Sequence, residues 1–229
     1  MVTDESDDGQ SSRAALRRLP PEKRVPLILE AALVEFAERG YGGARTAAIA
    51  ARAGVTRGLV HHYFPSKAEL FRAMVRSYMQ SALSNAERDL SAPSVSAWDL
   101  IQSIWEAGYG QIEQPGNQHH WTKLIVSESE QFPELAEFYK EEVLKPGVDL
   151  VRRVLRIGAA SGEFRPEVAE MPYLAEVLMA PTMMTRIWRL ILGDADAPDP
   201  KGMLAASLDM LRPALRAPTA LEADRKQVP

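Results

Sequence analysis

The residues with the clearest chemistry lie close together, between positions 56 and 63. This stretch offers hydrogen-bond donors that suit phosphate oxygens and the edges of bases: Arg57, His61, His62 and Tyr63. No Asp or Glu occurs between Thr46 and Lys67, although the whole chain contains 31 acidic residues. The stretch can therefore approach a polyanion without electrostatic repulsion from its own side chains.

The charge of the chain is unevenly distributed. Its 27 Lys and Arg against 31 Asp and Glu give a net charge of −4. Residues 13–76 nevertheless carry twelve basic and five acidic residues, so the remainder carries fifteen basic and 26 acidic ones. A basic segment on an otherwise acidic protein indicates a local anionic partner. Chance segregation of solvated charges is the alternative.

Composition excludes several classes of protein. The chain has 229 residues, of which 46% are hydrophobic, and it contains no cysteine. Disulfides and thiolate metal sites are therefore excluded. The chain contains no uninterrupted apolar run of about 18 residues, so we predict no transmembrane helix. The acidic first ten residues do not resemble a secretory signal. We expect a soluble, cytoplasmic protein that makes no membrane contact and needs no cofactor.

Helical periodicity dominates the sequence. Apolar residues recur at spacings of three and four, and strand-like alternation is absent, so we predict an all-α fold. Residues 1–19 are predicted to be a disordered polar arm, and residues 217–229 a polar tail. The longer helices are expected near residues 95–113, 118–130, 133–160, 172–192 and 200–215. Pro146 and Pro181 should kink or interrupt two of them.

Shorter helices are expected before residue 68. The first should begin near Pro26 and end at Gly40. Thr46 is predicted to cap the second helix, which ends at Gly54, and Thr56 to cap the third. The third ends before Pro65.

A fourth helix follows at a capping box formed by Ser66 and Glu69, and should extend to about Leu90. The second and third helices, joined by a turn at Gly54, form a helix-turn-helix pattern. In that motif the second of the two helices enters the major groove of DNA. We therefore predict a helix-turn-helix DNA-binding domain over residues 20–67 and a helical regulatory and dimerisation domain over residues 68–216.

Three segments in order, residues 29–41 (LEAALVEFAERGY), 49–55 (IAARAGV) and 63–71 (YFPSKAELF), closely resemble the N-terminal domain of the TetR family of transcriptional regulators. The resemblance covers roughly residues 24–79. Residues 127–135 (SESEQFPEL) and 162–165 (GEFR) are similar to the AefR-like subgroup of C-terminal domains. The resemblance implies a DNA-binding transcriptional regulator, most often a repressor that a small molecule releases from its operator.

The resemblance also implies roles for individual residues. Thr46, Tyr63 and Lys67 would contact the phosphate backbone. The residues that would face the groove are Thr56, Arg57, Gly58, His61 and His62. The family commonly has Tyr where this chain has His61, so affinity for DNA could depend on pH. Arg52 could contact DNA or only solvate the second helix. For Arg57 the alternative is that it pairs with an acidic side chain instead of a base.

Because one helix-turn-helix recognises few base pairs, we expect a homodimer on a palindromic DNA site. The last two long helices should supply the interface, as they do in the family's pattern. The predicted interface residues are Tyr173, Val177, Met184, Trp188, Ile191, Leu204, Leu208 and Leu211. The alternative is that these apolar stripes are buried within one chain.

A small apolar or aromatic effector is expected to bind among the middle helices. Aromatic and methionine side chains can line an adaptable cavity, although they can equally fill a core. The candidates are Trp105, Tyr109, Trp121, Phe138, Met179 and Met183. By resemblance, an effector would shift the fourth helix and change the separation of the two DNA-binding heads.

Other functions were weighed against this one. An enzyme lacks support because no phosphate-binding glycine loop, nucleophile elbow or H-E-x-x-H motif is present. A metal site built from His119, His120, Glu128 and Glu130 is conceivable, but adjacent helical residues point about 100° apart. A helical protein-interaction adaptor without DNA binding would have acidic groove-facing residues, whereas this chain has basic ones.

Overall fold

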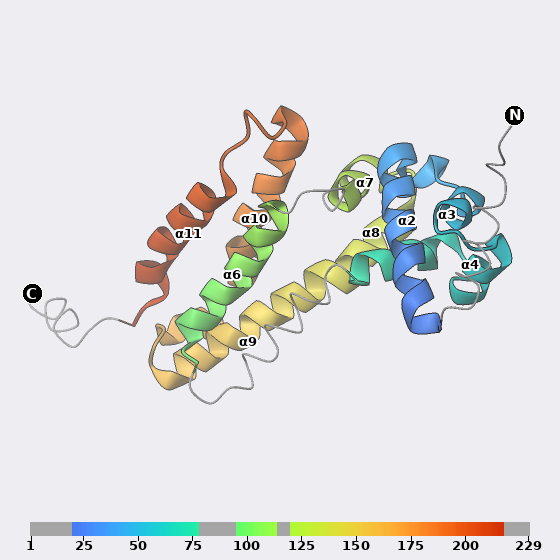
Figure 1. Cartoon of the computed structure of the whole chain (residues 1–229). Coiled ribbons are helices and arrows are strands. Elements are labelled where there is room, and N and C mark those ends of the chain that lie inside the picture. The colour runs from blue at the N-terminus through green and yellow to red at the C-terminus, as the bar shows by residue number, and fades with distance from the viewer. Residues whose placement is uncertain (1–19, 78–94, 114–119, 218–229) are drawn as a thin grey trace, which may run out of the picture. The chain divides into compact units, whose positions relative to one another are not determined.

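The computed structural model describes residues 20–77, 95–113 and 120–217 (Figure 1). Nearly all elements in these ranges are helices, so the all-α prediction is confirmed. The β-type pairing within the described ranges is an isolated antiparallel bridge between Phe164 and Arg216. None of the described helices is long and apolar enough to cross a lipid bilayer.

Contacts divide the described chain into two compact units. The N-terminal unit contains residues 20–77 and 120–139, and the C-terminal unit contains residues 95–113 and 140–217. Residues 120–139 thus pack with the helix-turn-helix, whereas the sequence assigned them to the regulatory domain. The compact units do not follow the predicted boundary at residue 67, and the functional division at that point remains a prediction.

The N-terminal unit is built around a helix-turn-helix. Its elements are α2 (Pro21–Gly43), α3 (Thr46–Arg52), α4 (Arg57–Tyr63), a helix over residues 67–77, α7 (His120–Glu128) and α8 (Pro133–Tyr139). We call residues 20–77 the head. Aromatic side chains dominate the core: Phe71 lies 5.3 Å from Phe36, 5.5 Å from Tyr41 and 5.6 Å from Phe138 between ring centroids.

Two predicted helix starts are wrong. The helix α2 begins at Pro21, not near Pro26, because Pro21 already occupies the first-turn position that tolerates a proline. Arg45, not Thr46, is the N-cap of α3 and makes no side-chain capping bond. The predicted break at Gly40 is confirmed by its left-handed φ of 72°, although the helical assignment continues to Gly43.

The other caps lie where the sequence indicated. The Thr56 hydroxyl accepts a hydrogen bond from the Leu59 N–H at 3.2 Å and opens α4. The Ser66 hydroxyl accepts from the Glu69 N–H at 3.1 Å and opens the next helix. That helix is described to residue 77, so its predicted end near Leu90 lies outside the described residues.

The C-terminal unit consists of longer helices. Its elements are α6 (Ala97–Glu113), the π-helical turn η2 (Lys140–Leu144), α9 (Lys145–Ser161), the 3-10 turn η3 (Pro166–Ala169), α10 (Leu174–Leu192) and α11 (Pro200–Leu215). The predicted interruption near Pro146 is present as η2, which immediately precedes Lys145. At Pro181 the predicted interruption is absent, and α10 continues through the proline.

In the C-terminal unit, residues 162–165 contact both the start of α6 and the end of α11. The Glu163 carboxylate accepts hydrogen bonds from the Ala97 N–H at 2.7 Å and the Trp98 N–H at 3.0 Å, and so caps α6. The Arg165 N–H donates to the Leu215 carbonyl at 2.9 Å. The 162–165 segment therefore joins the start of α6 to the end of α11.

Candidate DNA-binding surface

The turn between α3 and α4 has the geometry of a helix-turn-helix. Gly54 adopts a left-handed φ of 67°, and the Val55 N–H donates to the Ala50 carbonyl at 2.9 Å. Ile49 on α3 and Val60 on α4 are both fully buried. These anchors fix which face of α4 is turned inward, and leave its opposite face available to a partner.

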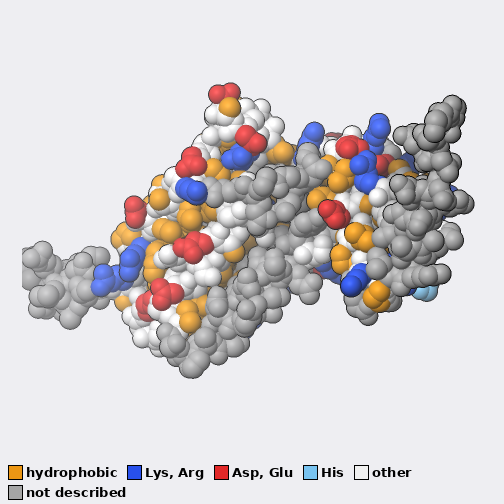
Figure 2. All heavy atoms as spheres, in the orientation of Figure 1, with side chains coloured by type: hydrophobic (Ala, Val, Ile, Leu, Met, Phe, Trp, Pro, Cys, Tyr) orange, Lys and Arg blue, Asp and Glu red, His pale blue; other side chains and the backbone are white. Residues whose placement is uncertain are grey.

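The outward face of α4 carries the predicted groove contacts. Thr56, Arg57, Gly58, His61 and His62 are all exposed. Histidine side chains reach the surface of the head in Figure 2. A Cβ atom added at Gly58 would meet nothing within 4 Å, so the backbone there is open to close approach. Arg57 and His61 are one helical turn apart and lie on the same face.

The two arginines that flank the turn differ in their partners. Within the described residues Arg57 makes no ion pair or hydrogen bond through its guanidinium, so the alternative of an acidic partner finds no support there. Arg52 instead donates to Glu38 at 2.8 Å and lies 3.8 Å from Glu35. The alternative that Arg52 solvates the head fits these contacts.

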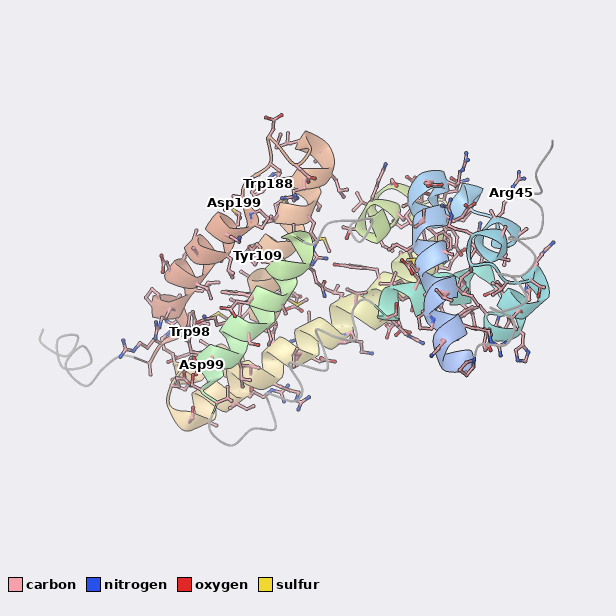
Figure 3. All side chains as sticks on the ribbon, in the orientation of Figure 1. Arg45, Trp98, Asp99, Tyr109, Trp188 and Asp199 are labelled. Atoms are coloured by element: carbon pink, nitrogen blue, oxygen red, sulfur yellow. The ribbon has the colours of Figure 1, made fainter. Side chains whose placement is uncertain are left out.

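The start of α3 presents a basic residue that is not among the predicted DNA contacts. Arg45 is exposed, and Figure 3 shows its side chain projecting outward beside the start of α3. Its backbone N–H is held by the Glu35 carboxylate at 3.3 Å. Thr46, the predicted phosphate contact, is half-buried next to it. A basic residue directly before the first helix of the motif was the available signal.

Lys67 is engaged inside the head. Its ammonium donates to the carbonyls of Tyr41 at 2.7 Å and Gly42 at 3.2 Å, and lies 4.7 Å from the centre of the Tyr41 ring. Lys67 therefore has a structural role beside its predicted phosphate contact. Tyr63 is half-buried, and its ring lies 5.4 Å from that of His62.

No group of three or more His, Asp or Glu side chains in the described ranges could hold a metal ion. Of the conceivable metal set, the side chains of His119 and His120 lie outside the described residues. The Glu128 carboxylate accepts hydrogen bonds from two backbone N–H groups.

The predicted effector residues fall in both units. Trp105 and Tyr109 are buried in the core of the C-terminal unit, with Met179 packed against the same cluster. The Trp105 indole donates to the Leu178 carbonyl at 3.1 Å, and the Tyr109 hydroxyl lies 3.4 Å from that of Ser207.

The remaining effector candidates are placed as follows. Met183 is half-buried on α10. Phe138 is buried in the aromatic core of the N-terminal unit, beside Phe71. The Trp121 side chain lies outside the described part of the structure.

The predicted interface residues differ in exposure between α10 and α11. On α10, Val177, Met184 and Ile191 are exposed by 60%, 43% and 71%, and Trp188 is half-buried; Tyr173, at the N-cap of α10, is exposed by 73%. On α11, the predicted residues are half-buried against the core of their own unit: Leu204, Leu208 and Leu211. We call the four exposed residues the α10 stripe.

Comparison with known proteins places this geometry in a family. Residues 28–74 match the family model described as bacterial regulatory proteins, tetR family. The chain is 27% identical to the HTH-type transcriptional repressor KstR2 of Mycobacterium tuberculosis over 144 residues, which cover 62% of this chain and 69% of KstR2. It is 41% identical to the HTH-type transcriptional repressor SCO4008 of Streptomyces coelicolor over 124 residues, covering 47% and 64% of the two chains.

A solved structure shares the fold over most of the chain. The regulator FadR from Bacillus subtilis, in complex with stearoyl-CoA, superposes with a TM-score of 0.64 at 19% identity, covering 83% of this chain and 98% of FadR. The fold, the exposed α4 and these relatives define a DNA-binding transcriptional regulator. Residues 28–74 belong to the TetR family, and the relatives that the chain resembles are transcriptional regulators. Its similarity to the AefR-like subgroup remains a prediction.

Proposed function

We propose that this protein is a homodimeric repressor in the cytoplasm that leaves a palindromic operator when a small apolar or aromatic effector binds. The observation that carries the proposal is the outward face of α4. It combines exposed hydrogen-bond donors, a cation without an acidic partner among the described residues, and an open backbone at Gly58. Such a face suits the major groove of duplex DNA.

In this proposal Arg57, His61 and His62 contact the groove, and Arg45, Thr46 and Lys67 contact phosphates at its edges. A guanidinium can donate two parallel hydrogen bonds to the O6 and N7 atoms of guanine. The Thr56 hydroxyl already accepts from Leu59, but it retains its own proton for a phosphate oxygen.

Dimerisation is supported by the α10 stripe. Val177, Met184 and Ile191 follow one another at spacings of seven residues, which places them on one side of the helix, and Tyr173 lies at its N-cap. Isolated exposed apolar residues are ordinary, whereas a continuous stripe indicates a partner surface. A second copy of the same helix would pair with it in a two-fold arrangement.

The effector is proposed by chemical class. The C-terminal unit buries Trp105, Tyr109 and Met179 in one cluster, and the related FadR structure holds stearoyl-CoA. An apolar or aromatic molecule would replace contacts among these side chains, and methionine can adapt to its shape.

Selection of bound fragments from a random DNA pool by the purified protein tests the proposal. We expect enrichment of a palindromic sequence, because two identical α4 helices would recognise two half-sites. Enrichment of a single unrepeated half-site would contradict the dimer, and no enrichment at low ionic strength would contradict DNA recognition itself.

A further inference from the structure

The turn that ends α2 is held from two sides by side chains distant in sequence. From one side, the Glu128 carboxylate at the end of α7 accepts hydrogen bonds from the N–H groups of Tyr41 at 3.0 Å and Gly42 at 2.9 Å. From the other side, Lys67 donates to the carbonyls of the same two residues. Both donors and both acceptors of this dipeptide are thus bound by charged groups.

The backbone of the turn is shaped for this contact. Gly40 has a φ of 72°, and a Cβ atom at this position would lie 2.5 Å from the Glu128 Oε1 atom. A Cβ atom at Gly42 would lie 3.0 Å from the Phe132 ring. The two glycines therefore permit the close approach of the turn that joins α7 to α8. Hydrogen bonds from backbone N–H groups to a carboxylate are stronger than those between neutral groups.

A second contact joins the turn that ends α2 to the α7–α8 region. The Tyr41 hydroxyl donates to the Glu134 Oε1 atom at 3.1 Å, and the Tyr41 ring lies 5.1 Å from that of Phe132. Burial, and then the neighbouring Glu134 carboxylate, raise the pKa of Tyr41 well above its usual value. The phenol therefore stays protonated and remains a donor.

These contacts reach the elements that flank the helix-turn-helix. Tyr41 lies five residues before α3, and Lys67 lies four residues after α4. On the other side of the contact are the end of α7 and the start of α8. A displacement of the α7–α8 turn would consequently shift the backbone just before α3. Through Tyr41 and Lys67 it would also shift the backbone just after α4.

We propose that Glu128 is a positioning residue for DNA binding, through which α7 and α8 set the orientation of α3 and α4 within the head. The inference rests on the proposed function of α4 as the DNA-contacting helix and goes beyond it by naming a contact that regulates that helix. Coupling of this kind is reciprocal, so DNA bound to α4 must also stabilise the α7–α8 turn.

The test compares the full-length wild type with Glu128→Gln and a matched control, Glu130→Gln. Glutamine at 128 keeps one acceptor oxygen but presents an amide donor to the second N–H group. Glu130 is an exposed carboxylate two residues away, so its substitution removes the same charge without that contact. Affinity for a duplex selected from the random pool is measured at several salt concentrations, and backbone amide hydrogen exchange is measured with and without that duplex.

We expect Glu128→Gln to bind the duplex at least about fivefold more weakly, with an unchanged salt slope because Glu128 does not contact phosphate. In the wild type and in Glu130→Gln, DNA should slow exchange in α3, α4 and residues 128–138. In Glu128→Gln the slowing should be confined to α3 and α4. A purely structural role would lower thermal stability without separating these two regions.

Wild-type affinity in Glu128→Gln, retained DNA-dependent protection of residues 128–138, or an equal loss in Glu130→Gln would each overturn the inference. If Glu128→Gln does not fold, Tyr41→Phe takes its place, since it removes only the hydrogen bond to Glu134 and keeps the ring. It should show a smaller loss of the same kind, and unchanged binding and protection in that variant would likewise refute the coupling. A wild type that binds no duplex would instead refute the proposed function.

Discussion

Arg52 and Arg57 lie on either side of one turn, yet their surroundings predict different effects of substitution. Arg57→Ala should relax discrimination at one base pair by about 1–3 kcal/mol, since its guanidinium, which has no acidic partner among the described residues, can bind a base edge bidentately. Titration of matched and singly mismatched operators measures this difference.

Arg52→Ala provides the control for Arg57→Ala. Its guanidinium already pairs with Glu38 at 2.8 Å, so base preference should not change. Loss of the exposed pair with Glu38 should cost at most about 1 kcal/mol of stability, and loss of the longer contact with the buried Glu35 adds to it. A shift in base preference in Arg52→Ala, with none in Arg57→Ala, would reverse the assignment.

Substitution of Lys67 should affect both the stability of the protein and its binding to DNA. Lys67→Ala should lower the free energy of unfolding by about 1–2 kcal/mol, because the carbonyls of Tyr41 and Gly42 lose a charged donor. It should also weaken binding to all sequences alike and reduce the magnitude of the salt slope by about one. Chemical denaturation and salt titration separate the two effects. A change in base preference with an unchanged salt slope would exclude a phosphate contact.

Because His61 is expected to contact DNA, we predict that the affinity for DNA depends on pH. A protonated imidazole donates more strongly to phosphate, so wild-type affinity should rise as the pH falls. Fluorescence anisotropy with a labelled operator measures the change. His61→Gln should lose this rise, whereas His62→Gln should keep it. An equal rise in His61→Gln would remove His61 as the cause.

At the scale of elements, the sequence predicted the helix caps that depend on contacts between nearby residues. The caps at Thr56 and Ser66 were predictable because each hydroxyl binds an N–H three residues ahead. The start of α3 was misplaced by one residue, because no side-chain bond marks it. The contact between Glu128 and Tyr41 spans 87 residues, and no local pattern encodes such a pairing. The sequence therefore predicted the helix-turn-helix but not the carboxylate that holds it.

Two glycines in the C-terminal unit make a matched test of helix packing. A Cβ atom at Gly158 on α9 would overlap the buried Phe164 ring, so Gly158→Ala should lower the free energy of unfolding by about 1–3 kcal/mol. Gly110 on α6 has nothing within 4 Å of such an atom. Gly110→Ala should therefore raise stability by about 0.5–1 kcal/mol through helix propensity. Thermal denaturation of both variants checks the contrast, and equal destabilisation would contradict the packing of α9 against the 162–165 segment.

At the scale of the whole molecule, composition and periodicity predicted the class of fold but not its division into units. Both compact units take in segments from separate parts of the chain. Phe138 and Trp105 were both predicted to contact the effector, yet the first packs in the N-terminal core and the second in the C-terminal core. Which apolar residue joins which core depends on tertiary packing, which helical periodicity alone does not specify.

The α10 stripe links assembly to DNA binding in the proposed dimer. Val177→Glu should shift the protein toward monomers, because a carboxylate at a 60% exposed position would become buried and unpaired in the interface. Loss of the second head should then weaken binding to the palindrome by a factor on the order of 100, since the two heads no longer bind together. Sedimentation velocity and operator titration measure the two changes. Ile157→Glu on α9, at a 42% exposed position outside the stripe, should leave both unchanged. A dimeric Val177→Glu with full affinity would place the interface elsewhere.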